Sequence, residues 1–238
     1  MRAGMQSTGR QATGRLAAAS VHILTGLGAV VALMAARAII ARDWDVMFLW
    51  LGVSFVIDGV DGPLARFFGV KQKIPTFSGE RLDWIIDYLT FVFIPVFAMV
   101  EAGFLPGLGG LVLAGVILMS SLYHFCDIGN KSDDGCFVGF PAIWNIVAFY
   151  CFAMQLSPLV TGIAVVVLAA ATFVPMKWVH PVRARWLRPI TALVTAVWSI
   201  VAVIVLIQGL PAEGWTEAVL IVCGLYGVGL SFSYGMAR

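Results

Sequence analysis

The sequence predicts an all-α polytopic membrane protein with about eight transmembrane helices and both termini in the cytoplasm. Of its 238 residues, 61% are hydrophobic and only 12% are charged, and the mean hydropathy is +0.95. Because an ordinary soluble domain has about 25% charged residues, a soluble protein of this size could not cover so much apolar surface. The composition therefore excludes a soluble enzyme, and a net charge of +2 does not indicate a nucleic-acid-binding surface.

Apolar segments follow one another along the whole chain, and each has close to the ~20 residues that span a bilayer. Proline and glycine mark the connections, as at Pro106-Gly107 and Pro158. The first segment is too long for a signal peptide and is expected to be retained. No repeat divides the chain, so we expect a single membrane domain over residues 1–238. Helices are expected at 16–40, 46–66, 81–104, 108–126, 137–155, 158–175, 187–208 and 214–234.

The distribution of basic residues predicts the orientation. With the N-terminus in the cytoplasm, Arg37 and Arg42 lie on the far side, and the other 13 of the 15 Lys and Arg residues lie on the cytoplasmic side. Cytoplasmic loops of membrane proteins carry an excess of Lys and Arg, so this distribution supports the assumed orientation. The cytoplasmic residues are Arg2, Arg10, Arg15, Arg66, Lys71, Lys73, Arg81, Lys131, Lys177, Arg183, Arg185, Arg188 and Arg238.

Four carboxylates lie near the cytoplasmic ends of the second and third expected helices. Asp58 and Asp61 are three residues apart, and Asp83 and Asp87 are four apart, so each pair shares one helix face. An acidic side chain at membrane depth costs about 3 kcal/mol or more, and a bound cation would offset the repulsion among four. Oxygen ligands without His or Cys suit a hard cation. The sequence therefore predicts a site for Mg²⁺ or Mn²⁺, with room for two ions.

Small residues and one arginine accompany these carboxylates. Gly62, Ala65 and Gly79 would let a substrate or a helix backbone approach closely, and Arg66 can grip a phosphate bidentately. Metal, small residues and arginine together indicate phosphate chemistry. Because intramembrane acids also serve as ion relays, a carboxylate-based transporter is the alternative from a different class.

These residues complete the pattern D-x-x-D-G-x-x-A-R followed by G-x-x-x-D-x-x-x-D, in which the chain resembles the CDP-alcohol phosphatidyltransferases. The motif covers residues 58–87 and has eight fixed positions, all present here. Its spacer, residues 67–78, has twelve residues and is longer than the family's usual one. A long spacer, the chain length and eight predicted spans resemble the branch of bacterial phosphatidylcholine synthases, which join choline to CDP-diacylglycerol.

The resemblance implies roles for the motif residues. Asp58, Asp61, Asp83 and Asp87 would hold Mn²⁺ or Mg²⁺, and Asp87 would also be the catalytic general base. The pyrophosphate and nucleotide of CDP-diacylglycerol would lie against Asp58, Asp61, Gly62, Ala65, Arg66, Gly79 and Asp83.

The resemblance also implies the setting of the reaction. Phosphatidylcholine and CMP would be the products, made in the bacterial inner membrane, and the orientation predicted from the basic residues places the site on the cytoplasmic side. The enzyme would contact membrane lipid and form a homodimer, with no nucleic acid as partner. Serine or a polyol phosphate is the alternative acceptor. Such an acceptor would need extra basic residues, and only Lys71, Lys73, Arg81 and Lys131 are near in sequence.

Aromatic residues near the motif are candidates for choline binding. A quaternary ammonium offers no N–H donor and is usually held by aromatic faces. Trp84, Tyr88, Tyr123 and Trp144 are the expected acceptor-binding residues, although Trp and Tyr also gather at membrane interfaces without binding a ligand. His22 and His124 are interpreted as ordinary polar residues of membrane helices.

Overall fold

The structure is a computed structural model that describes residues 2–129, 136–178 and 188–236. Side chains are described for 14–129, 136–178 and 189–231. Several basic residues used to predict the orientation, among them Lys131, Arg183 and Arg185, lie outside the described residues. Apart from the connecting turns and loops, the described chain consists of helices and one ribbon of two short strands.

The elements follow one another with short connections. In chain order they are α1 (Arg2–Ile40), α2 (Trp44–Phe68), α3 (Val70–Lys73), α4 (Gly79–Asp87), the π-helix η1 (Tyr88–Phe93), α5 (Ile94–Glu101), α6 (Gly107–Cys126), β1 (Phe137–Val138), α7 (Trp144–Ala153), α8 (Pro158–Ala171), β2 (Lys177–Trp178), α9 (Arg188–Gln208) and α10 (Trp215–Met236).

The helices confirm an all-α integral membrane protein. Within the described residues, five helical stretches are long and apolar enough to cross a bilayer. Three shorter apolar helices occupy the other expected positions. The number of crossings and the side on which the termini lie stay predictions. The long stretches are Gly14–Ile40, Trp44–Phe68, Gly79–Glu101, Gly107–Cys126 and Pro189–Gln208, and the shorter ones are Trp144–Ala153, Pro158–Ala171 and Trp215–Ser231.

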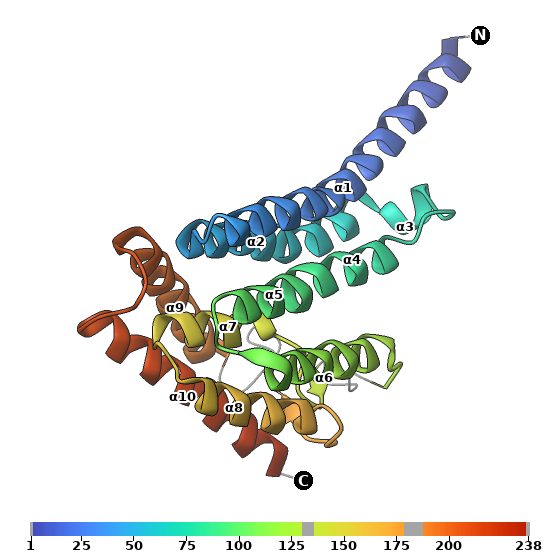
Figure 1. Ribbon diagram of the computed structural model, residues 1–238. Coiled ribbons are helices and arrows are strands. Elements are labelled where there is room, and N and C mark those ends of the chain that lie inside the picture. Colours follow the sequence, from blue (N-terminus) through green and yellow to red (C-terminus); the bar gives the residue numbers. More distant parts are fainter. Residues whose placement is uncertain (1, 130–135, 179–187, 237–238) are drawn as a thin grey trace.

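Helices α1, α2 and α4 form one group (Figure 1). A tight turn joins α1 to α2, so these two helices are antiparallel. Helix α4 packs along α1 in the parallel direction, because Ile86 meets Gly28 and the start of α4, Gly79, meets His22. The remaining helices pack as α5 with α7, α6 with α8 and α9 with α10. The chain reverses direction once between α1 and α2 and again between α2 and α4. The motif residues near the end of α2 therefore lie beside those at the start of α4.

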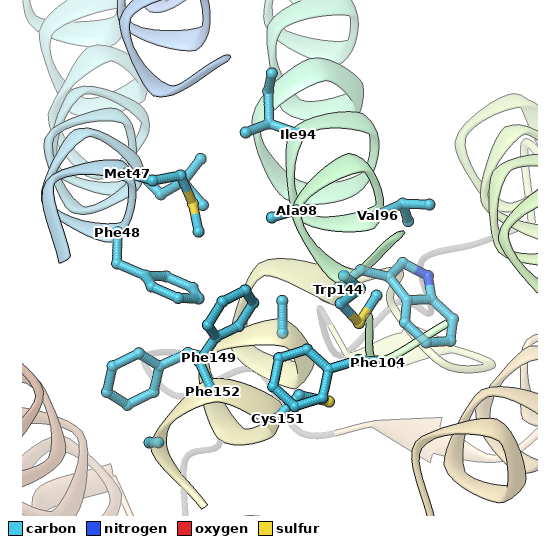
Figure 2. Close-up of a cluster of buried hydrophobic side chains, with 14 of the residues drawn as sticks. Met47, Phe48, Ile94, Val96, Ala98, Phe104, Trp144, Phe149, Cys151 and Phe152 are labelled. Carbon is cyan, nitrogen blue, oxygen red and sulfur yellow. The ribbon is translucent and has the colours of Figure 1, made fainter. Parts of the chain in front are cut away.

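The apolar core runs through most of the helices. Figure 2 shows the part of it to which α2, α5 and α7 contribute. Phe48 of α2 packs edge-on against Phe149 and Phe152 of α7, with ring centroids 5.4 and 5.2 Å apart. Phe104 packs on Phe152 at 4.7 Å. Edge-to-face contacts of this kind add to the energy of burial alone, so the aromatic side chains fix how α2 and α7 sit together.

One expected helix starts later than predicted. The segment 137–155 was expected to be helical throughout, but α7 begins only at Trp144. Phe137 instead pairs with Trp178 in the antiparallel β1–β2 ribbon. Gly139 follows with a φ of 79°, and a Cβ there would collide with the carbonyl oxygen of Thr172. The close approach of two backbones, with Gly139 in a left-handed conformation, excludes a helix here.

Candidate metal and phosphate site

Three of the four predicted carboxylates converge in the structure. One oxygen from each of Asp58, Asp83 and Asp87 lies within 4.8 Å of the other two, and all three side chains are half-buried. Carboxylates at this separation repel one another. A hard divalent cation bound between them would remove the repulsion, because such cations prefer oxygen ligands. The donor set therefore fits the predicted Mg²⁺ or Mn²⁺.

Asp61 lies beside this group rather than in it. Its side chain is only 6% exposed, and its Oδ2 accepts a hydrogen bond from Thr25 Oγ1 of α1 across 2.6 Å. The same hydroxyl lies 3.2 Å from the carbonyl oxygen of Val21, but its single proton serves one acceptor at a time. Asp61 stays a predicted metal ligand, and the structure adds Thr25 as the residue that orients it.

The long spacer folds into a compact connection that sets α4 against α1. Helix α2 ends at Gly69, whose φ of 60° gives a left-handed cap. The single turn of α3 follows, and Val70 is buried in a small apolar cluster with Ala18 and Val21 of α1. Ser78 then caps α4 by accepting a hydrogen bond from the Arg81 backbone N–H at 3.3 Å. Apolar docking and capping together place the first turn of α4, four residues before Asp83.

His22 of α1 fills the space beside the motif glycine Gly79. A Cβ on Gly79 would lie 2.7 Å from Cε1 and 3.2 Å from Nδ1 of His22, so any larger residue would displace the imidazole. The other neighbour of the ring is Phe77, at a centroid distance of 4.5 Å. His22 Nε2 is buried, with no hydrogen-bond partner among the described residues. Burying a polar atom without a hydrogen bond lowers stability by about 1–3 kcal/mol, so the environment of His22 Nε2 is unusual.

The other predicted phosphate-binding residues lie on the same end of α2. Gly62 is half-buried, and a Cβ on it would lie 3.5 Å from Nη1 of Arg66. Arg66 is exposed, so its guanidinium is accessible to a phosphate. Ala65 packs against the cluster of Val70 with α1. Ala65 thus has a packing contact in the structure, and its predicted contact with the nucleotide stays a prediction.

The four predicted acceptor-binding aromatics have different surroundings. Trp84 is 37% exposed. Tyr88 is half-buried, donates a hydrogen bond to the Leu118 carbonyl oxygen at 3.2 Å and packs edge-on against Phe125. Tyr123 is exposed and contacts Phe173. Trp144 has no exposed surface, and its indole N–H donates to Ser121 Oγ at 3.0 Å. Trp84 and Tyr88, which adjoin motif carboxylates in the chain, are therefore better placed than Trp144.

Sequence reasoning missed the contribution of α1. Thr25 contacts Asp61, 36 residues later in the chain, and His22 contacts Gly79, 57 residues later (79 − 22). A signal was present, because two polar residues three apart in an apolar helix share one face and intramembrane polar residues are commonly functional. Interpreting His22 as an ordinary helix residue overlooked that pattern.

Comparison with known proteins gives a consistent set of relatives. The chain is 38% identical over 207 residues to the phosphatidylcholine synthase of Rhizobium meliloti, which covers 87% of this chain and 86% of the relative. It is 44% identical over 188 residues to the phosphatidylcholine synthase of Pseudomonas aeruginosa, 79% of each chain. The phosphatidylcholine synthase of Agrobacterium fabrum is 38% identical with the same 87% and 86% coverage. No family model matches the chain.

Identities of 38–44% over 79–87% of the chain are well above the level at which membership is in doubt. The chain belongs to the phosphatidylcholine synthases.

Proposed function

We propose that this protein transfers the phosphatidyl group of CDP-diacylglycerol to choline, giving phosphatidylcholine and CMP. The observation that carries the proposal is the convergence of Asp58, Asp83 and Asp87 within 4.8 Å, in a chain that belongs to the phosphatidylcholine synthases. A half-buried group of carboxylates suits a reaction at a pyrophosphate, whose charge a cation must neutralise.

A divalent cation would be held by these three carboxylates, with Asp61 beside them as a further ligand. Only oxygen donors are present in this group, which favours Mg²⁺ or Mn²⁺ over softer metals. When bound, the metal would neutralise the pyrophosphate and stabilise the departing CMP. Two ions are part of the proposal, because four carboxylates exceed what a single Mg²⁺ usually takes from a protein.

Asp87 is the proposed general base. A choline hydroxyl is a weak nucleophile at neutral pH, and a carboxylate that accepts its proton makes attack easier. The hydroxyl oxygen bonds to the phosphatidyl phosphorus, the bond from that phosphorus to the CMP oxygen breaks, and its electron pair leaves with CMP. The exposed guanidinium of Arg66 would bind a phosphate of the donor through paired N–H groups.

Choline is proposed to bind against aromatic faces next to the acidic group. Tyr88 supports this proposal best, because it directly follows Asp87 and its hydroxyl is fixed by the Leu118 carbonyl oxygen. Trp84 offers partly exposed surface directly after Asp83. The carboxylates would themselves attract the positive charge of choline. We further propose a site facing the cytoplasm of a bacterial inner membrane, and a homodimer.

The test is release of CMP by the purified protein with CDP-diacylglycerol and Mn²⁺. Choline, serine, inositol and glycerol phosphate are offered separately, and only choline should give rapid release. The neutral isostere 3,3-dimethylbutanol should react far more slowly than choline, because it lacks the charge that an aromatic face attracts by about 0.5–2 kcal/mol.

Each other outcome has a definite meaning. If CMP is released faster with serine than with choline, serine is the acceptor, and the proposal of phosphatidyl transfer still holds. An isostere as good as choline would remove the aromatic cage. No CMP with any alcohol would reject the reaction, and flux of a substrate into vesicles would then favour the transporter.

A further inference from the structure

His22 is the one residue outside the motif whose ring contacts the motif backbone and also carries an unsatisfied polar atom in the described part of the chain. Its imidazole edge, through Cε1 and Nδ1, lies against Gly79, and one side of the ring meets Phe77. Its Nε2 is buried without a hydrogen-bond partner among the described side chains and backbone. A buried polar atom of this kind normally has a partner, so a ligand is a reasonable source of one.

The position of His22 along the helices indicates which part of a ligand it would meet. Gly79 precedes Asp83 by four residues, about 6 Å along the axis of α4. Because α1 and α4 are parallel, His22 lies about one turn from the acidic group, on the side of the spacer. Under the proposed function, the acyl chains of the donor stay in the lipid and its pyrophosphate lies at the carboxylates. The cytidine would then extend toward the spacer, where His22 is.

The chemistry of the side chain fits that neighbour. A neutral imidazole has one N–H donor and one acceptor nitrogen, and cytosine presents an amino donor beside acceptor atoms. We propose that His22 binds the cytidine part of the donor substrate through a hydrogen bond at Nε2. This inference rests on the proposed function, and it assigns His22 to nucleotide binding and not to the chemical step.

The experiment compares His22→Phe, which keeps a ring against Phe77 and Gly79 but has no nitrogen, with His22→Gln, which keeps a polar nitrogen. CMP binding to the full-length protein is measured by equilibrium dialysis with Mn²⁺, and ribose 5-phosphate serves as a probe without the base. His22→Phe should weaken CMP binding about tenfold, the scale of one lost hydrogen bond, and should raise the KM for CDP-diacylglycerol similarly. Its kcat, its choline KM and its ribose 5-phosphate affinity should stay within about twofold, and His22→Gln should lie between the two proteins.

Phe77→Leu is the matched packing control, because it loosens the other neighbour of the ring without touching a nitrogen. It should bind CMP within about twofold of the original protein. If His22→Phe binds CMP as tightly as the original, or loses CMP and ribose 5-phosphate to the same extent, the inference is wrong. A Phe77→Leu protein as impaired as His22→Phe would likewise show that packing alone matters.

A measurement on the unaltered protein covers the case in which His22→Phe does not fold. Hydrogen exchange at the imidazole C2 position, followed by mass spectrometry, should slow at His22 when CMP is added and stay constant at His124, which is buried in α6. No change at His22 under saturating CMP would overturn the inference. If the protein binds added CMP but forms no CMP from CDP-diacylglycerol with any alcohol, the proposed function fails. The assignment of His22 is then judged on the binding and exchange data alone. If it neither binds nor releases CMP, both fall.

Discussion

The two halves of helix α2 differ in what they contact, and the difference explains how one apolar helix can hold a reactive site. From Trp44 to Ser54 the inward side chains are apolar or small, and Phe48 is locked between aromatic rings of α7. From Asp58 onward two of the inward side chains are carboxylates: Asp58 joins the acidic group with α4, and Asp61 accepts a hydrogen bond from α1. The first half supplies rigidity, and the second half uses that rigidity to hold like charges close together. The predictions below separate these contributions, from the largest expected effect to the smallest.

Removing the metal should abolish activity and leave the first half of α2 unaffected. Dialysis against a chelator should reduce CMP release to background, because the carboxylates alone cannot neutralise a pyrophosphate. Adding Mg²⁺ or Mn²⁺ should restore the rate, and the helical circular dichroism signal should not change. Full activity in excess chelator, with elemental analysis showing no retained metal, would contradict the metal site.

Asp87→Asn should lower kcat about 10²-fold or more, the usual scale for loss of a general base. CDP-diacylglycerol binding should persist, because Asp58 and Asp83 remain. Rates measured at saturating choline, with metal content determined on the same sample, would separate loss of the base from loss of the ion. A mutant within about threefold of the original protein would remove Asp87 from the role of base.

Phe152→Ala tests the rigid half. It leaves a cavity beside Phe48 and Phe104 and should lower the free energy of unfolding by about 2 kcal/mol. This is less than the 3–5 kcal/mol seen in water-soluble cores, because an unfolded segment in a bilayer keeps its ring in lipid. Unfolding in mixed micelles gives the value. Phe93→Ala, at a 46% exposed position, is the matched control and should change stability by less than ~0.5 kcal/mol. Equal effects at the two positions would deny that the aromatic contacts fix α2.

Thr25→Val tests whether α1 supports the acidic half. The substitution keeps the shape of the side chain and removes the hydroxyl that donates to Asp61 at 2.6 Å. A hydrogen bond to a carboxylate contributes roughly 1.5–3 kcal/mol, so we expect about a tenfold fall in kcat/KM and a measurable drop in stability. Thr25→Ser retains the hydroxyl and should stay within about twofold. Identical behaviour of the two variants would assign Thr25 to packing alone.

Most of the fold could be predicted, because in a membrane protein hydropathy and element length are tightly linked. The second expected helix, 46–66, appears as Trp44–Phe68, and similar agreement holds for the segment that became α6. The expected helix does not form over 137–143, whereas α1 begins well before residue 16 and α8 ends before residue 175. Residues 137–143 are apolar, but they include Gly139 and Pro141, and closely spaced glycine and proline residues disfavour a helix. Strands of two residues whose partner lies forty positions away leave no periodic pattern to detect.

The candidate site was predicted as far as local spacing allowed. The spacing within each motif half places Asp83 and Asp87 on one face, and the antiparallel arrangement of α2 and α4 adds Asp58. What spacing cannot give is the packing of α1 on both helices, which depends on contacts between distant segments such as Gly28 with Ile86. For the same reason the burial of Trp144 could not be foreseen, since it depends on Ser121 and Phe140 from other segments.

The π-helix η1, between Asp87 and Ile94, has a consequence for how such proteins can vary. A π-helical turn holds one more residue than an α-helical turn, and one residue corresponds to about 100° of rotation. The π-helical turn thus rotates the side chains of α5 about the helix axis relative to those of α4. The carboxylates of the acidic end face α2, while Ile94 and Ala98 face the apolar core. Loss of one residue within Tyr88–Phe93 would leave both ends chemically intact but turned against each other. The number of residues between Asp87 and Ile94 is therefore as much a part of the proposed site as the carboxylates themselves.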